Sequence, residues 1–463
     1  MGKKERKFDY DLVVIGSGAA GAVIAESVAS CGKKVAIIES GSFGGYAPNF
    51  GDIPLRAALE SAHLFAKTKT AGTFGLRTNS VGYGFPGVKN WRESAILRSG
   101  VKKTAEYLRS RGVDVVRGRA HFISKNEITV GRNSNRRHIS SDKFVVATGI
   151  SRKIPKIFDE ISVLTPENIF DLNRPPKTLA VIGSGAEAVE LAEFFAILGT
   201  KVYMIEKKAE ILGGFDEEVS NEVREDFSKS YETEFLVSAE IFSVKKEGSL
   251  AKITYSAGGS EKSIKVEEVL FAESGSPCMD LGLVSAGVEF DEYGILTDDF
   301  LSTSAKNIFA AGNVAKRNFL NHVDISTTIY QASVASQNLF KRKKESAFSR
   351  PDYKTLAINP KVVSVGLSEI TLRENDIKYK KSVVQNNISS QANISGEARG
   401  FVKILASQKG EILGATIMGA GALEEIGVFS LAIRHGLTAE ILADEIQPFG
   451  SWNETVQTAL RQL

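Results

Sequence analysis

The sequence predicts an α/β fold built around two parallel sheets that are covered by helices. Three observations support this prediction. With 463 residues, of which 43% are hydrophobic and 24% are charged, the chain has the size of about three globular domains. A buried strand that runs directly into a glycine-rich turn and a helix occurs near the N-terminus. The same order of elements recurs near residue 180, and such repeats are typical of parallel α/β sheets.

The first repeat combines all the parts of a dinucleotide site. Its elements are a buried strand over 10–15, the turn G-S-G-A-A-G over 16–21, a helix over 22–30 and a strand over 34–38. Glycines in such a turn let backbone N–H groups approach a pyrophosphate at the start of the helix, and Glu39 at the strand end can accept hydrogen bonds from a ribose. The turn alone would also fit a simple chain reversal, but the complete set predicts a dinucleotide site.

The second repeat predicts a second dinucleotide site. Its elements are a strand over 178–182, the turn G-S-G-A-E-A over 183–188, a helix over 189–198 and a strand over 201–205. The strand ends at Glu206, which favours NADH over NADPH because a carboxylate accepts from a 2′-hydroxyl and repels a 2′-phosphate. Lys207 and Lys208 follow and would soften this preference, although a solvated turn is the simpler interpretation.

Composition argues against several other classes of function. The formal net charge is only +3 and the basic residues are scattered, which argues against a nucleic-acid partner. There is no run of about 18 apolar residues, so we expect no membrane span. No apolar region follows the basic residues at 1–7, so we expect no signal peptide. Cys31 and Cys278 lie far apart in the chain, which fits a reducing cytoplasm, and we expect Cys31 to be packed at the end of the first helix. No metal-ligand spacing joins the five histidines, which are His63, His121, His138, His322 and His435.

The segment G-G-Y-A-P-N-F-G-D-I-P-L-R over 44–56 resembles the redox helix of the FAD-dependent pyridine nucleotide-disulphide oxidoreductases. That family includes dihydrolipoamide dehydrogenase, glutathione reductase and mercuric reductase, and its pattern is G-G-T-C-x-N-x-G-C-I-P-S-K. Ala47 and Asp52 stand where the family has its two cysteines. Because a thiolate is the nucleophile in thiol-disulphide exchange, we expect no disulphide reduction by that route.

Further segments match the same family in the same order. They are F-V-V-A-T-G over 144–149, N-I-F-A-A-G-N-V over 307–314, N-P-K-V-V-S-V-G over 359–366 and G-E-I-L-G-A over 410–415. The resemblance implies two Rossmann-like domains, for FAD and NAD(P), and an α+β C-terminal dimerisation domain that makes a homodimer. The implied boundaries are 1–149 for the first part of the FAD domain, 150–271 for the NAD(P) domain, 272–345 for the return segment of the FAD domain and 346–463 for dimerisation.

Three departures from the family pattern affect its chemistry. Asn313 replaces the aspartate that contacts the flavin ribityl chain, which costs about 1 kcal/mol of charge-assisted hydrogen bonding but leaves FAD binding open. The second A-T-G-R-x-P turn has become A-E-S-G-S-P over 272–277. Phe449 replaces the catalytic histidine, although Glu454, which would orient it, remains. Phenylalanine cannot transfer a proton, so the base has been lost together with both thiols.

The resemblance assigns catalytic roles to Arg56, Glu190 and Asp52. Arg56 stands where the family has a lysine beside flavin N5, and Glu190 matches its glutamate partner. A cation there would stabilise charge during hydride transfer, and a structural ion pair is the alternative. Asp52 would relay a proton or, more simply, cap a helix. Tyr46, Phe50 and Phe449 would give the vacated thiol site an aromatic lining suited to a quinone, or serve only in packing.

The predicted function is an FAD-dependent NAD(P)H oxidoreductase that passes hydride from NADH to FAD and then electrons to a non-disulphide acceptor such as a quinone. The alternative is a catalytically retired homologue that acts as a nucleotide-binding or protein-binding module. Disulphide reduction with thiols supplied by a partner protein is a third possibility. The predicted cofactor-binding residues are Gly16, Ser17, Gly18, Ala19, Ala20, Gly21, Glu39, Gly44, Gly45, Ala120, Ala147, Thr148, Gly149, Gly183, Gly185, Ala188, Glu206, Gly312 and Asn313.

Overall fold

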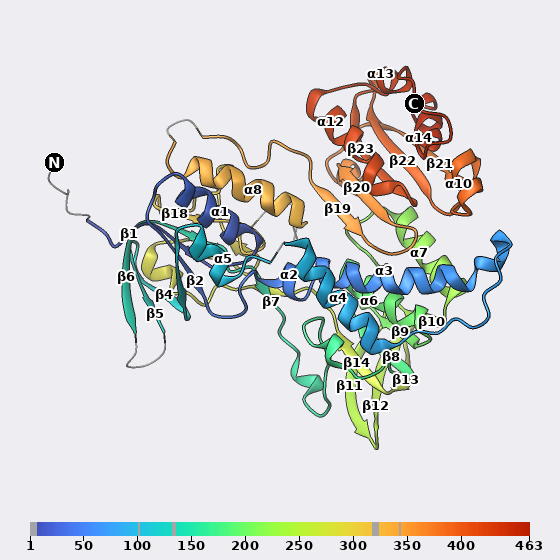
Figure 1. Ribbon diagram of the computed structural model, residues 1–463, viewed down its shortest axis with the longest axis horizontal. Coiled ribbons are helices and arrows are strands. Elements are labelled where there is room, and N and C mark those ends of the chain that lie inside the picture. Colours follow the sequence, from blue (N-terminus) through green and yellow to red (C-terminus); the bar gives the residue numbers. More distant parts are fainter. Residues whose placement is uncertain (1–6, 101, 132–135, 317–323, 342–343) are drawn as a thin grey trace. The chain divides into compact units, whose positions relative to one another are not determined.

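The computed structural model describes residues 7–100, 102–131, 136–316, 324–341 and 344–463 (Figure 1). The chain divides into two compact units. The first comprises Met1–Pro54, Ala95–Lys153 and Gly275–Ser349, and the second comprises Leu55–Ser94, Ile154–Ser274 and Arg350–Leu463. The domain boundaries expected from the sequence stay a prediction.

The first unit is organised around a seven-stranded sheet in which β18 joins the order β3-β2-β1-β6-β5-β4 by pairing with β6. Its strands are β1 (Tyr10–Ile15), β2 (Val35–Glu39), β3 (Val113–Arg117), β4 (Ala120–Ser124), β5 (Glu127–Val130), β6 (Arg137–Val146) and β18 (Ile308–Ala310), with short strands β7 (Ile150–Ser151), β15 (Ser276–Pro277), β16 (Phe290–Asp291) and β17 (Gly294–Ile295) outside it. Its helices are α1 (Ala19–Ser30), α2 (Tyr46–Asn49), α5 (Ala105–Ser110) and α8 (Ile325–Asn338).

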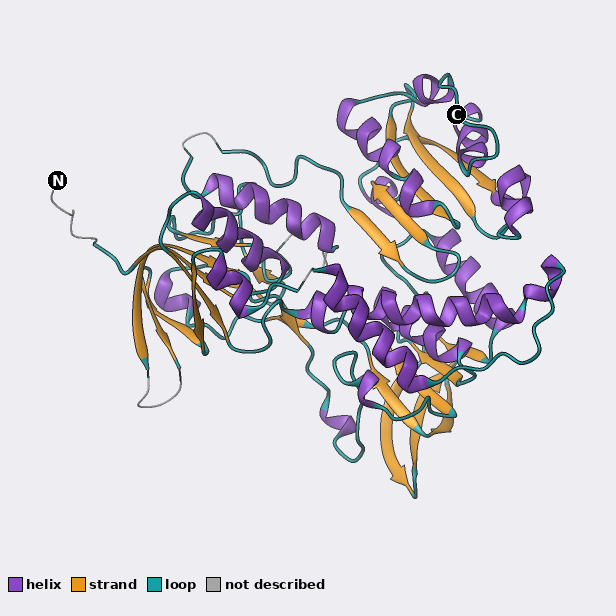
Figure 2. Cartoon of the chain, viewed as in Figure 1, coloured by secondary structure: helices purple, strands orange, loops and turns teal. Residues whose placement is uncertain are grey.

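Both faces of the parallel part of this sheet are buried, which explains why its strands are continuously apolar. Along β1, Leu12 and Val14 point to one face and pack with α1 and α8, which lie side by side (Figure 2). Val13 and Ile15 point to the other face and pack with residues of β4 and β5. The sheet therefore presents the carboxyl ends of β1, β2 and β6 along one edge.

The second unit contains a parallel sheet in the order β10-β9-β8-β14 and two antiparallel sheets, β11-β12-β13 and β19-β20-β23-β22-β21. The elements before residue 275 are β8 (Thr178–Ile182), α6 (Ala186–Ile197), β9 (Lys201–Ile205), α7 (Glu217–Ser230), β10 (Thr233–Leu236), β11 (Glu240–Glu247), β12 (Leu250–Ala257), β13 (Ser260–Val266) and β14 (Glu268–Phe271). The elements after residue 350 are β19 (Tyr353–Leu356), β20 (Val362–Gly366), α9 (Glu369–Glu374), β21 (Tyr379–Gln385), α10 (Ser390–Ser395), β22 (Phe401–Ser407), β23 (Ile412–Met418), α11 (Ala422–Glu425), α12 (Gly427–His435), α13 (Ala439–Ala443) and α14 (Asn453–Arg461).

The helices α3 (Asp52–Lys69) and α4 (Phe85–Ser99) each include residues of both units. In the second unit, Leu55 and Leu59 of α3 share one hydrophobic core with α6, with β19 and with Phe401 of β22. The part of this unit before residue 275 and the part after residue 350 are therefore joined through a common interior.

The predicted fold class is confirmed, because both predicted repeats form a strand, a glycine turn and a helix. The helix α1 begins at Ala19, three residues before the predicted start, because the turn ends at Gly18 and the following alanines favour a helix.

The expectation for Cys31 was wrong. Cys31 is exposed rather than packed, since it follows the last residue of α1 where the chain turns toward Gly32. Among the residues that the structure describes, no helix has the length and apolar character needed to cross a bilayer.

A buried ionic cluster ties the two parts of the second unit together. Lys403 of β22 has a side chain only 1% exposed, and its Nζ lies 2.6 Å from Glu369 Oε2, 2.7 Å from Glu218 Oε2 and 3.1 Å from Asp216 Oδ2. Asp216 and Glu218 come from the start of α7, before residue 275, whereas Glu369 opens α9 in the part after residue 350. Burial by itself would raise the pKa of Glu369, but hydrogen bonds from Lys403, Tyr379 and Lys381 outweigh burial and bring the pKa to about 2.

We expect Lys403→Met to lower the free energy of unfolding by about 3–5 kcal/mol, because it leaves three carboxylates close together without their buried cation. Equilibrium denaturation in urea would measure the loss. The exposed Lys409→Met is the matched control and should stay within about 0.5 kcal/mol of the parent protein. Equal stability of the two variants would contradict a structural role for the cluster.

The same cluster predicts an acid-dependent loss of stability. The pKa of Glu369 is lower in the folded state than its ordinary value of 4.5, so its contribution to stability is complete above about pH 4.5. That contribution should fall as the pH decreases from about 4.5 toward 2. Unfolding curves measured across this interval should show a smaller pH-dependent loss for Glu369→Gln than for the parent protein.

Candidate functional site

Three backbone segments meet at the carboxyl ends of β1 and β6. Gly16 has φ +102°, and a Cβ at this position would lie 2.3 Å from the carbonyl oxygen of Ala147. Gly45 has φ +72° and ψ −158°, and its Cβ would lie 2.4 Å from Gly18 Cα. Only glycine tolerates this combination of dihedral angles and close contact. The turn after β1, the loop at 44–45 and the turn after β6 therefore form one cradle of backbone.

The N-terminus of α1 opens into this cradle. Gly18 is the N-cap residue, and it has no side-chain oxygen to accept from the first N–H groups of the twelve-residue helix. Such an end, with its positive dipole, suits a pyrophosphate. The residues present therefore fit the diphosphate of a dinucleotide such as FAD.

Glu39 is fixed in place by the turn that it faces. Its Oε2 accepts hydrogen bonds from the backbone N and the Oγ of Ser17, at 2.8 and 2.7 Å, and its Oε1 accepts from Gly41 N at 2.7 Å. Ser17 Oγ in turn accepts from Gly44 N at 3.2 Å. Because a carboxylate has about four lone-pair sites, acceptor capacity remains for a ribose hydroxyl.

The other predicted flavin-domain residues lie on neighbouring elements of the same unit. A Cβ at Gly312, which follows β18 and has φ +73°, would lie 3.5 Å from Ala20 Cβ, so the segment before the half-buried Asn313 closely approaches α1. Thr148 Oγ1 donates to the carbonyl oxygen of Cys278 at 2.8 Å and so anchors the turn after β6. Ala120 is buried at the start of β4.

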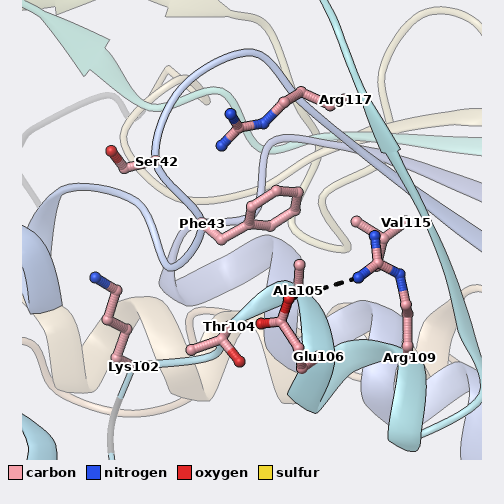
Figure 3. Close-up of a pocket in the computed structure, with 9 residues that line it drawn as sticks. All are labelled: Ser42, Phe43, Lys102, Thr104, Ala105, Glu106, Arg109, Val115 and Arg117. Carbon is pink, nitrogen blue, oxygen red and sulfur yellow. Dashed lines mark ion pairs between the residues drawn. The ribbon is translucent and has the colours of Figure 1, made fainter.

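A cavity of about 550 Å³ lies at the ends of β2 and β3 in the first unit (Figure 3). Arg117 is paired with Glu39 across these two strands. The Arg117 Nη2 donates a hydrogen bond to the carbonyl oxygen of Gly41 at 3.4 Å, and the guanidinium carbon lies 5.7 Å from the centre of the Phe43 ring. The lining residues are Ser42, Phe43, Lys102, Thr104, Ala105, Glu106, Arg109, Val115 and Arg117. Three cations face one carboxylate, so the cavity favours an anion. The sequence argument missed it, although an arginine at the end of a parallel strand was the available signal.

The second glycine turn repeats the design of the first. Gly183 has φ +106°, and its Cβ would lie 3.0 Å from Glu273 N, so here too the turn packs against the chain that leaves the neighbouring strand. Gly185 is the N-cap residue of α6. Glu206 Oε2 accepts from Ser184 Oγ at 2.6 Å and Oε1 accepts from Lys208 N at 2.8 Å. Ala188 is fully buried, which permits close packing of helix and strand.

The two lysines after Glu206 do not act as a pair. Lys207 Nζ lies 2.8 Å from Glu240 Oε1, so its charge is directed into an exposed ion pair. Lys208 contributes its backbone N–H to Glu206. These contacts agree with the simpler interpretation of both residues as part of a solvated turn.

Asp52 and Arg56 lie one turn apart near the start of α3. Arg56 Nη2 donates to Thr355 Oγ1 at 2.9 Å, and Glu190 Oε1 of α6 accepts from Ala357 N at 2.6 Å. Arg56 and Glu190 are thus both hydrogen-bonded to the stretch 355–357 at the end of β19.

Glu193, one turn after Glu190, repeats this arrangement. Its Oε1 accepts from Asn359 N at 3.0 Å, and its Oε2 lies 2.9 Å from His63 Nε2 of α3. The side chain of Glu193 is fully buried. Neither Thr355 nor Glu193 was singled out from the sequence, because their roles depend on contacts distant in the chain.

Phe449, the C-terminal residue that departs from the family pattern, lies at the surface of the chain. Phe449 is 93% exposed, so it lines no cavity within one protomer. Glu454 accepts hydrogen bonds from Gly450 N through Oε1 at 3.1 Å and from Ser390 N through Oε2 at 2.5 Å. Glu454 therefore holds the turn that follows Phe449.

Metal-ligating side chains do not gather in the described part of the chain, where no group of three or more histidine, cysteine, aspartate or glutamate residues could hold an ion. His322 lies outside the described residues.

Comparisons with known proteins agree with these observations. Residues 10–338 match the model of the pyridine nucleotide-disulphide oxidoreductases, and residues 354–460 match the model of their dimerisation domain. Mercuric reductase of Staphylococcus aureus is 30% identical, covering 98% of this chain and 82% of the relative. Dihydrolipoyl dehydrogenase of Staphylococcus aureus is also 30% identical, covering 97% of this chain and 96% of the relative. The structure of LpdA from Mycobacterium tuberculosis superposes with a TM-score of 0.85 at 22% identity, over 97% of this chain and 99% of that one.

We expect Gly45→Ala to destabilise the protein by more than about 2 kcal/mol, because a Cβ would combine an unfavourable backbone conformation with a 2.4 Å contact to Gly18 Cα. Gly32→Ala is the matched control. Gly32 also has positive φ, +76°, but its Cβ would meet no described atom within 4 Å, so strain alone should cost about 1–2 kcal/mol. Denaturation of both variants measures the difference, and equal losses would mean that the close approach is not required.

Proposed function

We propose, because this chain belongs to the pyridine nucleotide-disulphide oxidoreductase family, that it is a flavoenzyme that oxidises NADH and reduces an acceptor other than a disulphide. The family is FAD- and NAD(P)H-dependent. The observation that carries the proposal is the combination of two intact dinucleotide cradles with alanine and aspartate at the two thiol positions. A chain without these thiols can accept a hydride but cannot pass it on by thiol-disulphide exchange.

The residues that would hold FAD are the cradle at Gly16, Gly18 and Gly45, the carboxylate of Glu39 and the segment at Gly312 and Asn313. The bound flavin would supply a carrier that accepts a hydride from the nicotinamide and releases electrons to a second substrate. The cations around the cavity beside Glu39 give this end of the site a positive field, which favours a diphosphate. The second cradle, at Gly183 and Gly185, would hold NADH.

Arg56 would stabilise negative charge near the flavin N5 position that the family pattern assigns to it. Thr355 orients its guanidinium through the hydrogen bond at 2.9 Å, and Glu190 holds the backbone of the same strand end. Asp52, one turn earlier on α3, would face the acceptor side and move a proton there. Residues 354–460 match a dimerisation domain, and we propose a homodimer.

The test of this function is an anaerobic stopped-flow experiment in which the FAD-loaded protein is mixed with NADH. Rapid loss of flavin absorbance is expected, followed by reoxidation when a quinone is added. Lipoamide and glutathione disulphide should not reoxidise the flavin. Flavin that stays oxidised in NADH would overturn the proposal.

We expect Arg56→Met to slow flavin reduction by NADH about tenfold to hundredfold, because a charge that stabilises the transition state is removed. Thr355→Val should give a smaller loss, since Arg56 remains but is less firmly oriented. Lys69→Met, an exposed cation at the other end of α3, is the control and should be without effect. An unchanged rate for Arg56→Met would leave this residue a structural role only.

Coenzyme choice should depend on Glu206. We expect Glu206→Ala to raise the ratio of kcat/KM for NADPH over NADH by about tenfold, because repulsion of a 2′-phosphate is removed and a hydrogen-bond acceptor for the 2′-hydroxyl is lost. Glu210→Ala, an exposed charge change four residues later, is the control. An equal change in both variants would indicate a general effect of net charge instead of recognition at the ribose.

A further inference from the structure

The cavity at the ends of β2 and β3 has a lining of its own (Figure 3). Its residues come from the loop after β2, from the stretch 102–109 and from β3, and they differ from the residues of the cradle at 16–18, 39 and 45. All of them belong to the first unit. The volume of about 550 Å³ is within the usual range of small-molecule pockets, about 300–1,000 Å³. The cavity is therefore large enough for a ligand in addition to FAD.

Part of the lining is apolar and firmly held. Figure 3 shows the ring of Phe43 at the centre of the lining residues. Phe43 and Val115 pack against the hydrophobic core that includes residues of α1 and α8. The guanidinium carbon of Arg117 lies 5.7 Å from the centre of the Phe43 ring. A ring with a planar cation beside it suits a ligand with a flat aromatic body.

The charges of the lining favour an anion. Lys102, Arg109 and Arg117 with the single carboxylate of Glu106 give a net charge of +2. Arg109 Nη1 lies 3.6 Å from Glu106 Oε1. Within the part of the chain that the structure describes, neither Lys102 nor Arg117 forms an ion pair. Because a guanidinium has five N–H donors and Arg117 uses one for Gly41 O, it has donors for the oxygens of a phosphate.

The carboxylate of Glu106 serves its own helix. Hydrogen bonds with its own backbone N–H and with the Thr104 hydroxyl lower the pKa of Glu106, so this residue is charged at neutral pH. Thr104 Oγ1 also accepts from Tyr107 N at 3.2 Å. The negative charge is thus directed to the first turn of α5, and Lys102 and Arg117 remain for an incoming anion.

The loop at 41–44 lies between the cradle and the cavity. Gly41 N donates to Glu39 Oε1, and Gly44 N donates to Ser17 Oγ, so these two N–H groups are directed to the cradle. The carbonyl oxygen of Gly41 accepts from Arg117 of the cavity. The same loop therefore contributes to two sites through different atoms.

We propose that this cavity binds a phosphate monoester of an aromatic ring, as a site separate from both dinucleotide cradles. Lys102 and Arg117 would bind the phosphate oxygens. The ring would pack on the apolar surface of Phe43, Ala105 and Val115. The inference goes beyond the proposed function and does not depend on the oxidation of NADH.

The test is a calorimetric titration of the FAD-loaded protein with phenyl phosphate at constant ionic strength. We expect one equivalent to bind, at least about fivefold more tightly than inorganic phosphate or phenol, because each of these probes keeps only half of the contacts. Arg117→Met should weaken binding about tenfold, since charged hydrogen bonds are lost, and Arg117→Lys should restore part of the affinity. Arg119→Met is the matched control and should bind as the parent does, because Arg119 lies 3.5 Å from Asp280 and is not a lining residue.

The flavin absorbance in the same titration separates the cavity from the cradle. Retention of FAD at saturating phenyl phosphate is expected for two distinct sites, and release of FAD would overturn the inference. It would also be overturned if the parent bound no phenyl phosphate, if Arg117→Met bound it as tightly as the parent, or if inorganic phosphate bound equally well. A parent protein that retains no FAD would contradict the proposed function, whereas the titration of that protein would still decide whether the cavity binds the monoester.

Discussion

The close approach of backbone at the carboxyl ends of β1 and β6 is the constraint on which the first unit depends. Gly16 against Ala147 and Gly45 against Gly18 leave no room for a Cβ, and this brings the N-terminus of α1 to the surface of a cradle. Ser17 and Glu39 then complete the turn through hydrogen bonds that also fix the loop at 41–44. The second unit repeats the arrangement with Gly183, Ser184 and Glu206, so the same local structure occurs twice in the chain.

The chain keeps this scaffold and changes the side chains that would meet the second substrate. Alanine and aspartate stand where the family pattern has its two cysteines, and Arg152 donates a hydrogen bond to the hydroxyl of Tyr46, the residue before Ala47. Arg56 keeps a positive charge where the family has lysine, and its planar guanidinium reaches a hydroxyl on β19. The glycine cradles and the side chains at the two thiol positions are thus separate groups of residues.

The sequence predicted the parts of the structure that depend on local pattern. The strands over 10–15 and 178–182 were predicted to the residue, because apolar β-branched runs that end in glycine have few alternatives. Contacts between distant segments could not be predicted in the same way. Arg152 follows a family motif but does not belong to it, and Lys403 is an isolated lysine in an apolar strand whose three carboxylate partners are 34 to 187 positions away. The exposure of Cys31 and Phe449 likewise depends on where the chain turns.

Within the second unit, the helix α6 connects the second glycine turn to the end of β19. The helix begins at the second glycine turn. Glu190 and Glu193 lie on one side of it and accept hydrogen bonds from the backbone N–H groups of Ala357 and Asn359. Thr355, two residues before Ala357, holds Arg56. These hydrogen bonds tie the second glycine turn, the 355–359 segment and the Arg56 guanidinium into one mechanical body within the second unit.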